Sequence, residues 1–118
     1  MYEIFFSSAA ESYFKKLKER PLKNAYQEAL TAISTDPYCG TPKHGDLAGI
    51  YSCDMKYQGV SYEIAYTIHD SNGKTIVVVL AGTRENFYEQ LKKFACNFFR
   101  FVQGGSGNAK YQIKHRPA

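Results

Sequence analysis

Arg84 and Tyr88 have the residue types and the spacing that chemistry on a phosphate group requires. Arg84 follows an apolar run and a Gly-Thr break, so we expect it at a helix N-terminus, where free N–H groups and the helix dipole attract phosphate. A guanidinium beside those groups would clamp the phosphate. Tyr88 lies one helical turn later on the same side, where a phenol can stack on a base or donate a proton. The alternatives are a surface Arg84 paired with Glu85 or Glu89, and a Tyr88 at the rim of the core.

A second group of polar residues occurs earlier in the chain. Histidine is the residue type suited to acid–base work near neutral pH, so His44 is a candidate, and Glu63 could be its partner in a base–acid pair. No feature of the sequence places these two side chains together. Lys43 and Lys56 could supply positive charge toward a phosphate from neighbouring loops. The alternative for His44 is a turn or packing residue.

Most of the net positive charge of the chain comes from its last segment. The net charge is +4, but Lys110, Lys114 and Arg116 account for three of the 15 basic residues, which leaves 12 against 11 acidic ones and a net +1. A nucleic-acid interaction would therefore need a local basic surface rather than net charge. The three cysteines have no CxxC spacing, so neither a disulfide scaffold nor a metal site is expected, and no cofactor is implied.

Reduced thiols fit a cytoplasmic protein. The chain opens on a strand-like run with no signal-peptide pattern. It has no apolar stretch of membrane-spanning length, so we expect no membrane partner.

The elements that must position these residues begin with a strand and two helices. Residues 2–6 form a strand-like run, and Ser8 with Glu11 matches a capping box whose helix we expect to end near Arg20. A second helix follows and stops at the Asp-Pro pair at 36–37. Its apolar stripe recurs at helical spacing and consists of Leu22, Ala25, Tyr26, Ala29, Leu30 and Ile33.

The hydrophobic period then changes to two, which indicates strands. Alternating runs cover residues 51–56 and 61–69, with a turn near Gln58-Gly59 and hairpin turn chemistry at 70–73. Residues 75–81 are almost wholly apolar, as expected of a central strand covered on both faces.

A final helix completes the predicted order. Gly82-Thr83 should break the last strand, with Thr83 as the N-cap of that helix, whose apolar stripe is Phe87, Leu91, Phe94 and Phe98. The order β-α-α-β-β-β-α predicts an α+β fold, in which an antiparallel sheet packs against a helical hairpin and a C-terminal helix. We expect one domain over residues 1–102. A flexible tail over 103–118, artificial or natural, opens with a linker-like Gly-Gly-Ser-Gly.

Short motifs along residues 2–95 resemble those of the RelE/ParE toxin superfamily of type II toxin–antitoxin systems. They occur in the family's order and spacing, and they are Ile4-Phe5-Phe6-Ser7-Ser8-Ala9, Asp36-Pro37, His44-Gly45-Asp46-Leu47 with Ile50-Tyr51-Ser52, Tyr62-Glu63-Ile64-Ala65-Tyr66, and Ala81-Gly82-Thr83-Arg84-Glu85-Asn86-Phe87-Tyr88. The resemblance implies a toxin silenced by an antitoxin protein. It further implies either a metal-independent endoribonuclease (an mRNA interferase that cuts messenger RNA on the ribosome) or, in the ParE branch, a non-enzymatic inhibitor of DNA gyrase.

The chain departs from the nuclease branch at three positions. The resemblance places Arg84 in the active centre, but the positions that carry cations on the second and third strands hold Ser52, Asp54 and Glu63 here. Each acid adds negative charge beside the path of a phosphate and weakens RNA binding. Lys43, His44 and Lys56 would have to supply the missing charge.

A further basic group lies on the predicted helical hairpin. Lys15 and Lys16, with Lys18, Arg20 and Lys23, could contact ribosomal RNA or an acidic antitoxin segment, or could be a solvated helix face. We expect a partner segment to bind across the sheet or the hairpin, because three tyrosines are predicted to be half-exposed on their strands: Tyr51, Tyr62 and Tyr66.

The sequence therefore predicts a growth-inhibiting toxin. Ribosome-dependent mRNA cleavage is the first hypothesis for its mechanism. Gyrase inhibition and an inactive antitoxin-binding module are the alternatives.

Overall fold

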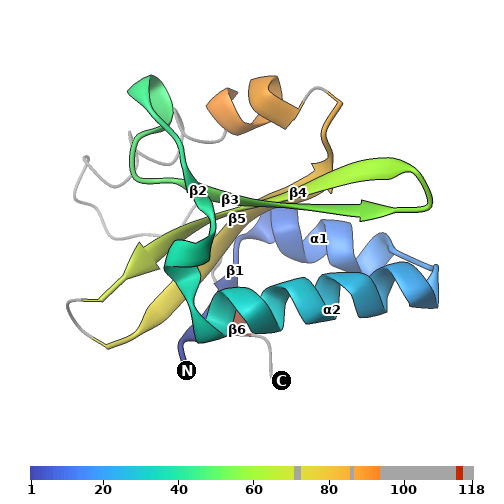
Figure 1. The fold of residues 1–118 in the computed structure, drawn as a ribbon, viewed down its shortest axis with the longest axis horizontal. Coiled ribbons are helices and arrows are strands. Elements are labelled where there is room, and N and C mark those ends of the chain that lie inside the picture. Colours follow the sequence, from blue (N-terminus) through green and yellow to red (C-terminus); the bar gives the residue numbers. More distant parts are fainter. Residues whose placement is uncertain (71–72, 86, 94–113, 116–118) are drawn as a thin grey trace.

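A six-stranded sheet with a helical hairpin on one face forms the centre of the fold (Figure 1). The computed structural model describes residues 1–70, 73–85, 87–93 and 114–115. The strands are β1 (Glu3–Phe6), β2 (Thr41–Pro42), β3 (Tyr51–Tyr57), β4 (Val60–His69), β5 (Thr75–Thr83) and β6 (Lys114–His115). They lie in the order β2-β3-β4-β5-β1-β6, and neighbouring strands are antiparallel except for the parallel pair β1 and β5.

The helical elements complete the predicted α+β class. They are α1 (Ser8–Lys16), α2 (Arg20–Thr35), the short 3-10 turns η1 (Pro37–Cys39) and η2 (Gly45–Leu47), and a helical stretch over residues 87–93. The fold class predicted from the sequence is confirmed. No helix in the described part of the chain is both long enough and apolar enough to cross a membrane.

The start of α1 lies one residue away from the predicted capping box. Ser7, not Ser8, is the N-cap, and its hydroxyl accepts a hydrogen bond from the Ala10 N–H at 3.1 Å. The same hydroxyl donates to the Val79 carbonyl at 2.9 Å, so it joins the helix to the sheet. The expected end near Arg20 is also wrong. α1 stops at Lys16 and Arg20 begins α2, because a proline in the first turn suits a helix start.

The main core lies between the hairpin and the sheet. The buried stripe of α2 contains Leu22, Tyr26, Leu30 and Ile33, as predicted. The expectation that three strand tyrosines are half-exposed holds for Tyr51 alone, because Tyr62 and Tyr66 are only 9% and 0% exposed. Both point at the hairpin, and the buried Tyr66 hydroxyl donates to the Pro37 carbonyl at 2.6 Å.

A tight β-turn joins β3 to β4 at the position predicted from the sequence. Gln58 and Gly59 have positive φ angles of 51° and 79°, as a tight two-residue turn requires. β5 is buried over most of its length, as expected of a central strand. The strand does not break at Gly82, and Thr83 is its last residue rather than a helix N-cap.

The face of the sheet away from the hairpin is also buried in part. A second core lies there, formed by Leu47, Ile50, Ala65, Val77, Val79, Leu80, Phe87 and Leu91. Phe87 and Leu91 are buried as predicted, whereas Phe94 and Phe98 lie outside the described residues. Of the predicted tail, residues 114–115 pair with β1, and the remainder also lies outside the described residues.

Candidate functional site

Two acidic side chains lie on the same face of the sheet as the second core. Glu63 on β4 and Asp54 on β3 are direct cross-strand partners. The Glu63 side chain is 5% exposed, whereas that of Asp54 is 58% exposed. Like charges that face one another across antiparallel strands destabilise a sheet unless cations compensate them. The geometry therefore calls for basic neighbours.

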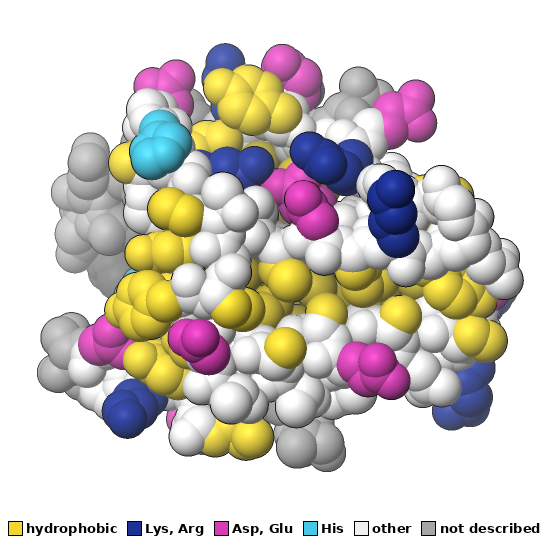
Figure 2. Space-filling view, viewed as in Figure 1, with side chains coloured by type: hydrophobic (Ala, Val, Ile, Leu, Met, Phe, Trp, Pro, Cys, Tyr) yellow, Lys and Arg dark blue, Asp and Glu magenta, His cyan; other side chains and the backbone are white. Residues whose placement is uncertain are grey.

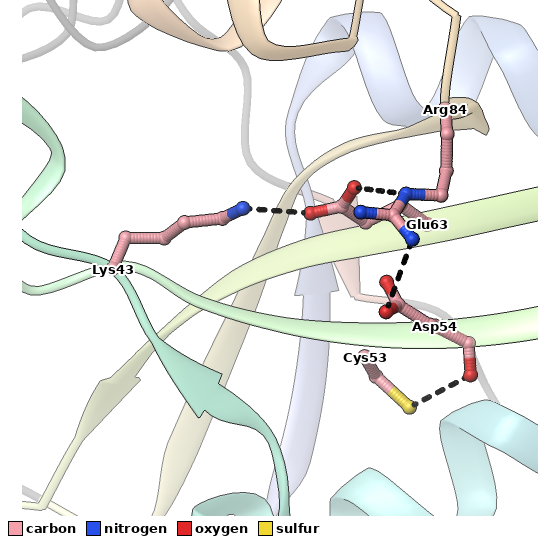
Figure 3. A network of polar contacts seen from close by, with 5 residues as sticks. All are labelled: Lys43, Cys53, Asp54, Glu63 and Arg84. Carbon is pink, nitrogen blue, oxygen red and sulfur yellow. Dashed lines mark hydrogen bonds and ion pairs between the residues drawn. The ribbon is translucent and has the colours of Figure 1, made fainter.

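Lys43 and Arg84 supply that compensation from two distant parts of the chain (Figure 3). Lys43 Nζ lies 3.0 Å from Glu63 Oε2. Arg84 Nε lies 3.7 Å from Glu63 Oε1, and Arg84 Nη1 lies 3.7 Å from Asp54 Oδ2. Glu63 thus sits between two cations, and the four side chains together carry no net charge. We call these four residues the charge cluster.

Backbone contacts hold both cations in place. The Lys43 N–H donates to the Ile50 carbonyl at 2.8 Å, which fixes the segment after β2 against the start of β3. The Arg84 N–H donates to the Ser61 carbonyl at 3.1 Å, which extends the pairing of β4 and β5 past the end of the strand. Their side chains are 27% and 58% exposed, so solvent reaches both cations as well as Asp54.

Glu63 Oε2 has a close cation but no well-aligned donor. The Lys43 ammonium is within ion-pair distance, yet Oε2 accepts no hydrogen bond of normal geometry from the described residues. A buried carboxylate oxygen normally accepts such bonds. The pairing is therefore mainly electrostatic.

The expected setting of Arg84 is only partly reproduced. It lies in a bend before the helical residues 87–93, and its carbonyl accepts a hydrogen bond from the Phe87 N–H at 3.1 Å. The guanidinium pairs with Asp54 and Glu63 rather than with Glu85 or Glu89, the two acids suggested by the sequence.

The other candidates take no part in the ion pairs of the charge cluster. Within the described residues, the ion-pair partners of Glu63 are Lys43 and Arg84 rather than His44. His44 is exposed and precedes η2, and Lys56 is exposed on β3 two residues beyond Asp54. Tyr88 is 54% exposed, and Lys92 Nζ lies 5.4 Å from the centroid of its ring.

Lys15 and Lys16 belong to a different surface. Both are exposed on α1, which packs on the opposite face of the sheet from the charge cluster. Lys18, Arg20 and Lys23 are exposed on the same hairpin. The structure therefore separates the predicted basic hairpin from the predicted catalytic residues.

The pairing of Asp54 with Glu63 had a signal in the sequence. A two-residue turn at Gln58-Gly59 places Tyr57 opposite Val60, and moving three residues away from the turn on each strand places Asp54 opposite Glu63. The approach of Lys43 had no such signal, because a loop and a short edge strand bring it there.

Comparison with known proteins identifies the family. The family described as "ParE-like toxin of type II bacterial toxin-antitoxin system" matches residues 4–92. The chain belongs to this family. A solved structure, that of the toxin–antitoxin complex RelBE2 from Mycobacterium tuberculosis, is similar, with 28% sequence identity and a TM-score of 0.56. The match covers 70% of this chain and 98% of that chain. No curated protein matches.

The resemblance to RelE/ParE toxins drawn from the sequence motifs is therefore confirmed, and the chain is a ParE-like toxin. In this ParE-like toxin, the positions expected to carry RNA-directed cations hold the two carboxylates of the charge cluster.

Proposed function

We propose that this ParE-like toxin inhibits growth by binding a protein target, with DNA gyrase as the first candidate, and does not cut RNA. The observation that carries the proposal is the neutral charge cluster. Lys43 and Arg84 are engaged by Glu63 and Asp54, so they offer a phosphate little net attraction. Metal-independent RNA cleavage needs cations that stabilise a phosphorane-like transition state.

The buried position of Glu63 strengthens this argument. Its side chain is 5% exposed, so its carboxylate is packed inside the fold beside the two cations rather than free in solvent. A phosphate that approached Lys43 and Arg84 would meet the carboxylate between them, and repulsion between the two anions would oppose binding. Gyrase enters as the target because the resemblance is to toxins whose ParE branch inhibits that enzyme.

One observation favours mRNA cleavage as the second candidate. The Arg84 side chain is 58% exposed and both its ion pairs are 3.7 Å long, so a bound phosphate could draw the guanidinium away from the carboxylates. The exposed His44 and Lys56 would then be additional groups for acid–base work and charge.

The antitoxin is the other proposed partner, and we place both proteins in the cytoplasm. Because Tyr62 and Tyr66 are buried, the sheet face beneath the hairpin is not available to a partner segment. The outer surface of the hairpin is available, and its exposed basic residues favour an acidic segment: Lys15, Lys16, Lys18, Arg20 and Lys23.

The deciding experiment measures RNA ends and DNA supercoiling with the same purified protein. We expect no new 5′ ends by primer extension on an mRNA in a translating extract, and a loss of gyrase supercoiling activity at matched toxin concentrations. New 5′ ends that appear with the wild type and vanish with Arg84→Ala would establish the nuclease instead. Loss of one such preorganised donor typically slows cleavage by about 10²–10³-fold.

Two further variants distinguish binding from catalysis. Arg84→Lys restores a nuclease only in part, because an ammonium cannot reproduce the planar fork of a guanidinium. Lys74→Ala, a matched loss of one exposed positive charge outside both proposed surfaces, controls for general effects on solubility and charge. If the wild type neither cuts RNA nor inhibits gyrase and does not slow growth, the chain is an antitoxin-binding module and the proposal is wrong.

A further inference from the structure

The outer edge of β3 is open over most of its length. β2 pairs only with Tyr51 and Ser52, so the stretch Cys53–Tyr57 has no strand partner on that side among the described residues. An edge strand with free backbone groups is a template for another strand.

The backbone direction at this edge can be derived from the contacts of β2. The Ile50 carbonyl accepts from the Lys43 N–H, so it points toward β2. Alternate residues of an antiparallel strand direct both backbone groups to the same neighbour. The N–H and C=O groups of Asp54 and Lys56 therefore point outward from the open edge, where the Asp54 carbonyl has only a long contact of 3.9 Å from the Cys53 thiol.

We propose that a second copy of this chain pairs with this edge, β3 against β3, across a two-fold axis at Met55. In that register Asp54 of each copy lies opposite Lys56 of the other. Both are outward-directed residues, so each pair exchanges two backbone hydrogen bonds, and each pair joins opposite charges. Cys53 lies opposite Tyr57 of the other copy, and the two Met55 side chains meet at the axis.

The charges select this register over its neighbours. A two-fold axis at Asp54 would oppose two aspartates and would bring Lys56 against Ser52, which β2 already occupies. An axis at Lys56 would oppose two lysines and would bring Asp54 against Gln58 in the turn. A lysine on an edge strand normally discourages pairing, but here each lysine meets an aspartate.

The surfaces beside the edge fit a self-complementary contact. Figure 2 shows hydrophobic side chains in a band between β3 and α2, with charged side chains above it. On that side Cys53, Met55, Tyr57 and Ala29 are only partly buried against the main core. Asp54 also pairs with Arg84, but its side chain is 58% exposed and leaves an oxygen for the lysine of the partner copy.

Charge-reversal variants test both the contact and its register. We expect the full-length wild type to show a concentration-dependent dimer in sedimentation equilibrium. Asp54→Lys leaves like charges in both cross-strand pairs, and so does Lys56→Asp. Each single variant should weaken the dimer by about tenfold or more, since both pairs change from attraction to repulsion.

Two combinations should restore the dimer. A mixture of the two single variants places opposite charges across both pairs and should form a heterodimer, and the double variant Asp54→Lys/Lys56→Asp should again form a homodimer. Lys74→Asp, an exposed reversal just before β5 and away from the open edge, should leave the association unchanged. Circular dichroism verifies that each variant is folded.

A register-specific cross-link provides a second measurement. The two Met55 residues would be a non-hydrogen-bonded pair with Cα atoms about 4.5 Å apart, which is within the range for a disulfide. Met55→Cys, with the native cysteines changed to serine, should form a covalent dimer on oxidation. A wild type that stays monomeric over the concentration series overturns the proposal. So does a dimer that the single reversals leave intact, or one that the mixture fails to restore.

Discussion

Removing the charge of Lys43 and removing the charge of Glu63 should lower the stability of the fold by different amounts. Lys43→Met leaves the Glu63 carboxylate, 5% exposed, with Arg84 as its remaining ion-pair partner at 3.7 Å. Leaving a buried charge unpaired costs about 3–5 kcal/mol. Because Arg84 still compensates Glu63 in part, we expect a loss of about 2–3 kcal/mol in the free energy of unfolding.

Glu63→Gln should cost less. The amide keeps the volume of the side chain, and the two charges left behind are on Lys43 and Arg84, which are 27% and 58% exposed and can be solvated. For pairs in which water reaches the remaining charge, the loss is about 1 kcal/mol or less. The double variant Lys43→Met/Glu63→Gln should be more stable than Lys43→Met alone, since it buries no unpaired charge.

Urea unfolding followed by circular dichroism measures these differences, and the slope with urea verifies that the transition is comparable among variants. Lys23→Met is the matched control, because this exposed lysine should change stability by about 0.5 kcal/mol or less. If Glu63→Gln proves more costly than Lys43→Met, the burial argument is refuted. It is equally refuted if the costs of the two single changes simply add.

Three further outcomes follow from other contacts. Ser7→Ala should lower the free energy of unfolding by about 1–2 kcal/mol, because it removes both the N-cap of α1 and the hydrogen bond to the Val79 carbonyl. The control Ser12→Ala, on the exposed side of α1, should leave the free energy of unfolding nearly unchanged. The Tyr38 hydroxyl donates to Asp70 at 2.6 Å, and this bond, together with Tyr2, holds the pKa of the Asp70 carboxyl below its usual range. The contact therefore stabilises the fold above pH about 4, and this stabilisation is lost as the pH falls through the lowered pKa. Tyr38→Phe should raise the pKa of Asp70 in an NMR titration, and an unchanged value would contradict the assigned cause. Removing residues 103–118 should lower Tm by no more than a few degrees, because β6 contributes only two residues of pairing, and a larger drop in calorimetry would show that the tail packs on the domain.

The elements were predictable from the sequence where one local rule decided the outcome. The stripe of α2, the turn at Gln58-Gly59 and the buried β5 all follow from hydrophobic period and turn chemistry. The N-cap was misplaced by one residue because two adjacent serines satisfy the same pattern, and only the contact with Val79 distinguishes Ser7.

The strand tyrosines were misjudged for a different reason. The alternating pattern identifies one face of β4 but does not say what covers it, and the hairpin covers Tyr62 and Tyr66 completely enough to bury them. For the candidate site, the sequence named Lys43, Glu63 and Arg84 separately. Their assembly depended on contacts between loops and strands far apart in the chain, which no local pattern encodes.

The arrangement of the charge cluster bears directly on the choice between a nuclease and a binding toxin. The turn at Gln58-Gly59 fixes the register that puts Asp54 opposite Glu63, and two acids in that position repel one another. Lys43 and Arg84 relieve that repulsion, so the fold itself uses the cations that an RNA-cleaving face would direct at a phosphate. Replacing the acids with cations would gather four positive charges around one position of the sheet and create a site that attracts RNA. The same four positions can therefore hold a neutral binding surface or a cationic catalytic one, and the acids at Asp54 and Glu63 give this toxin the neutral surface.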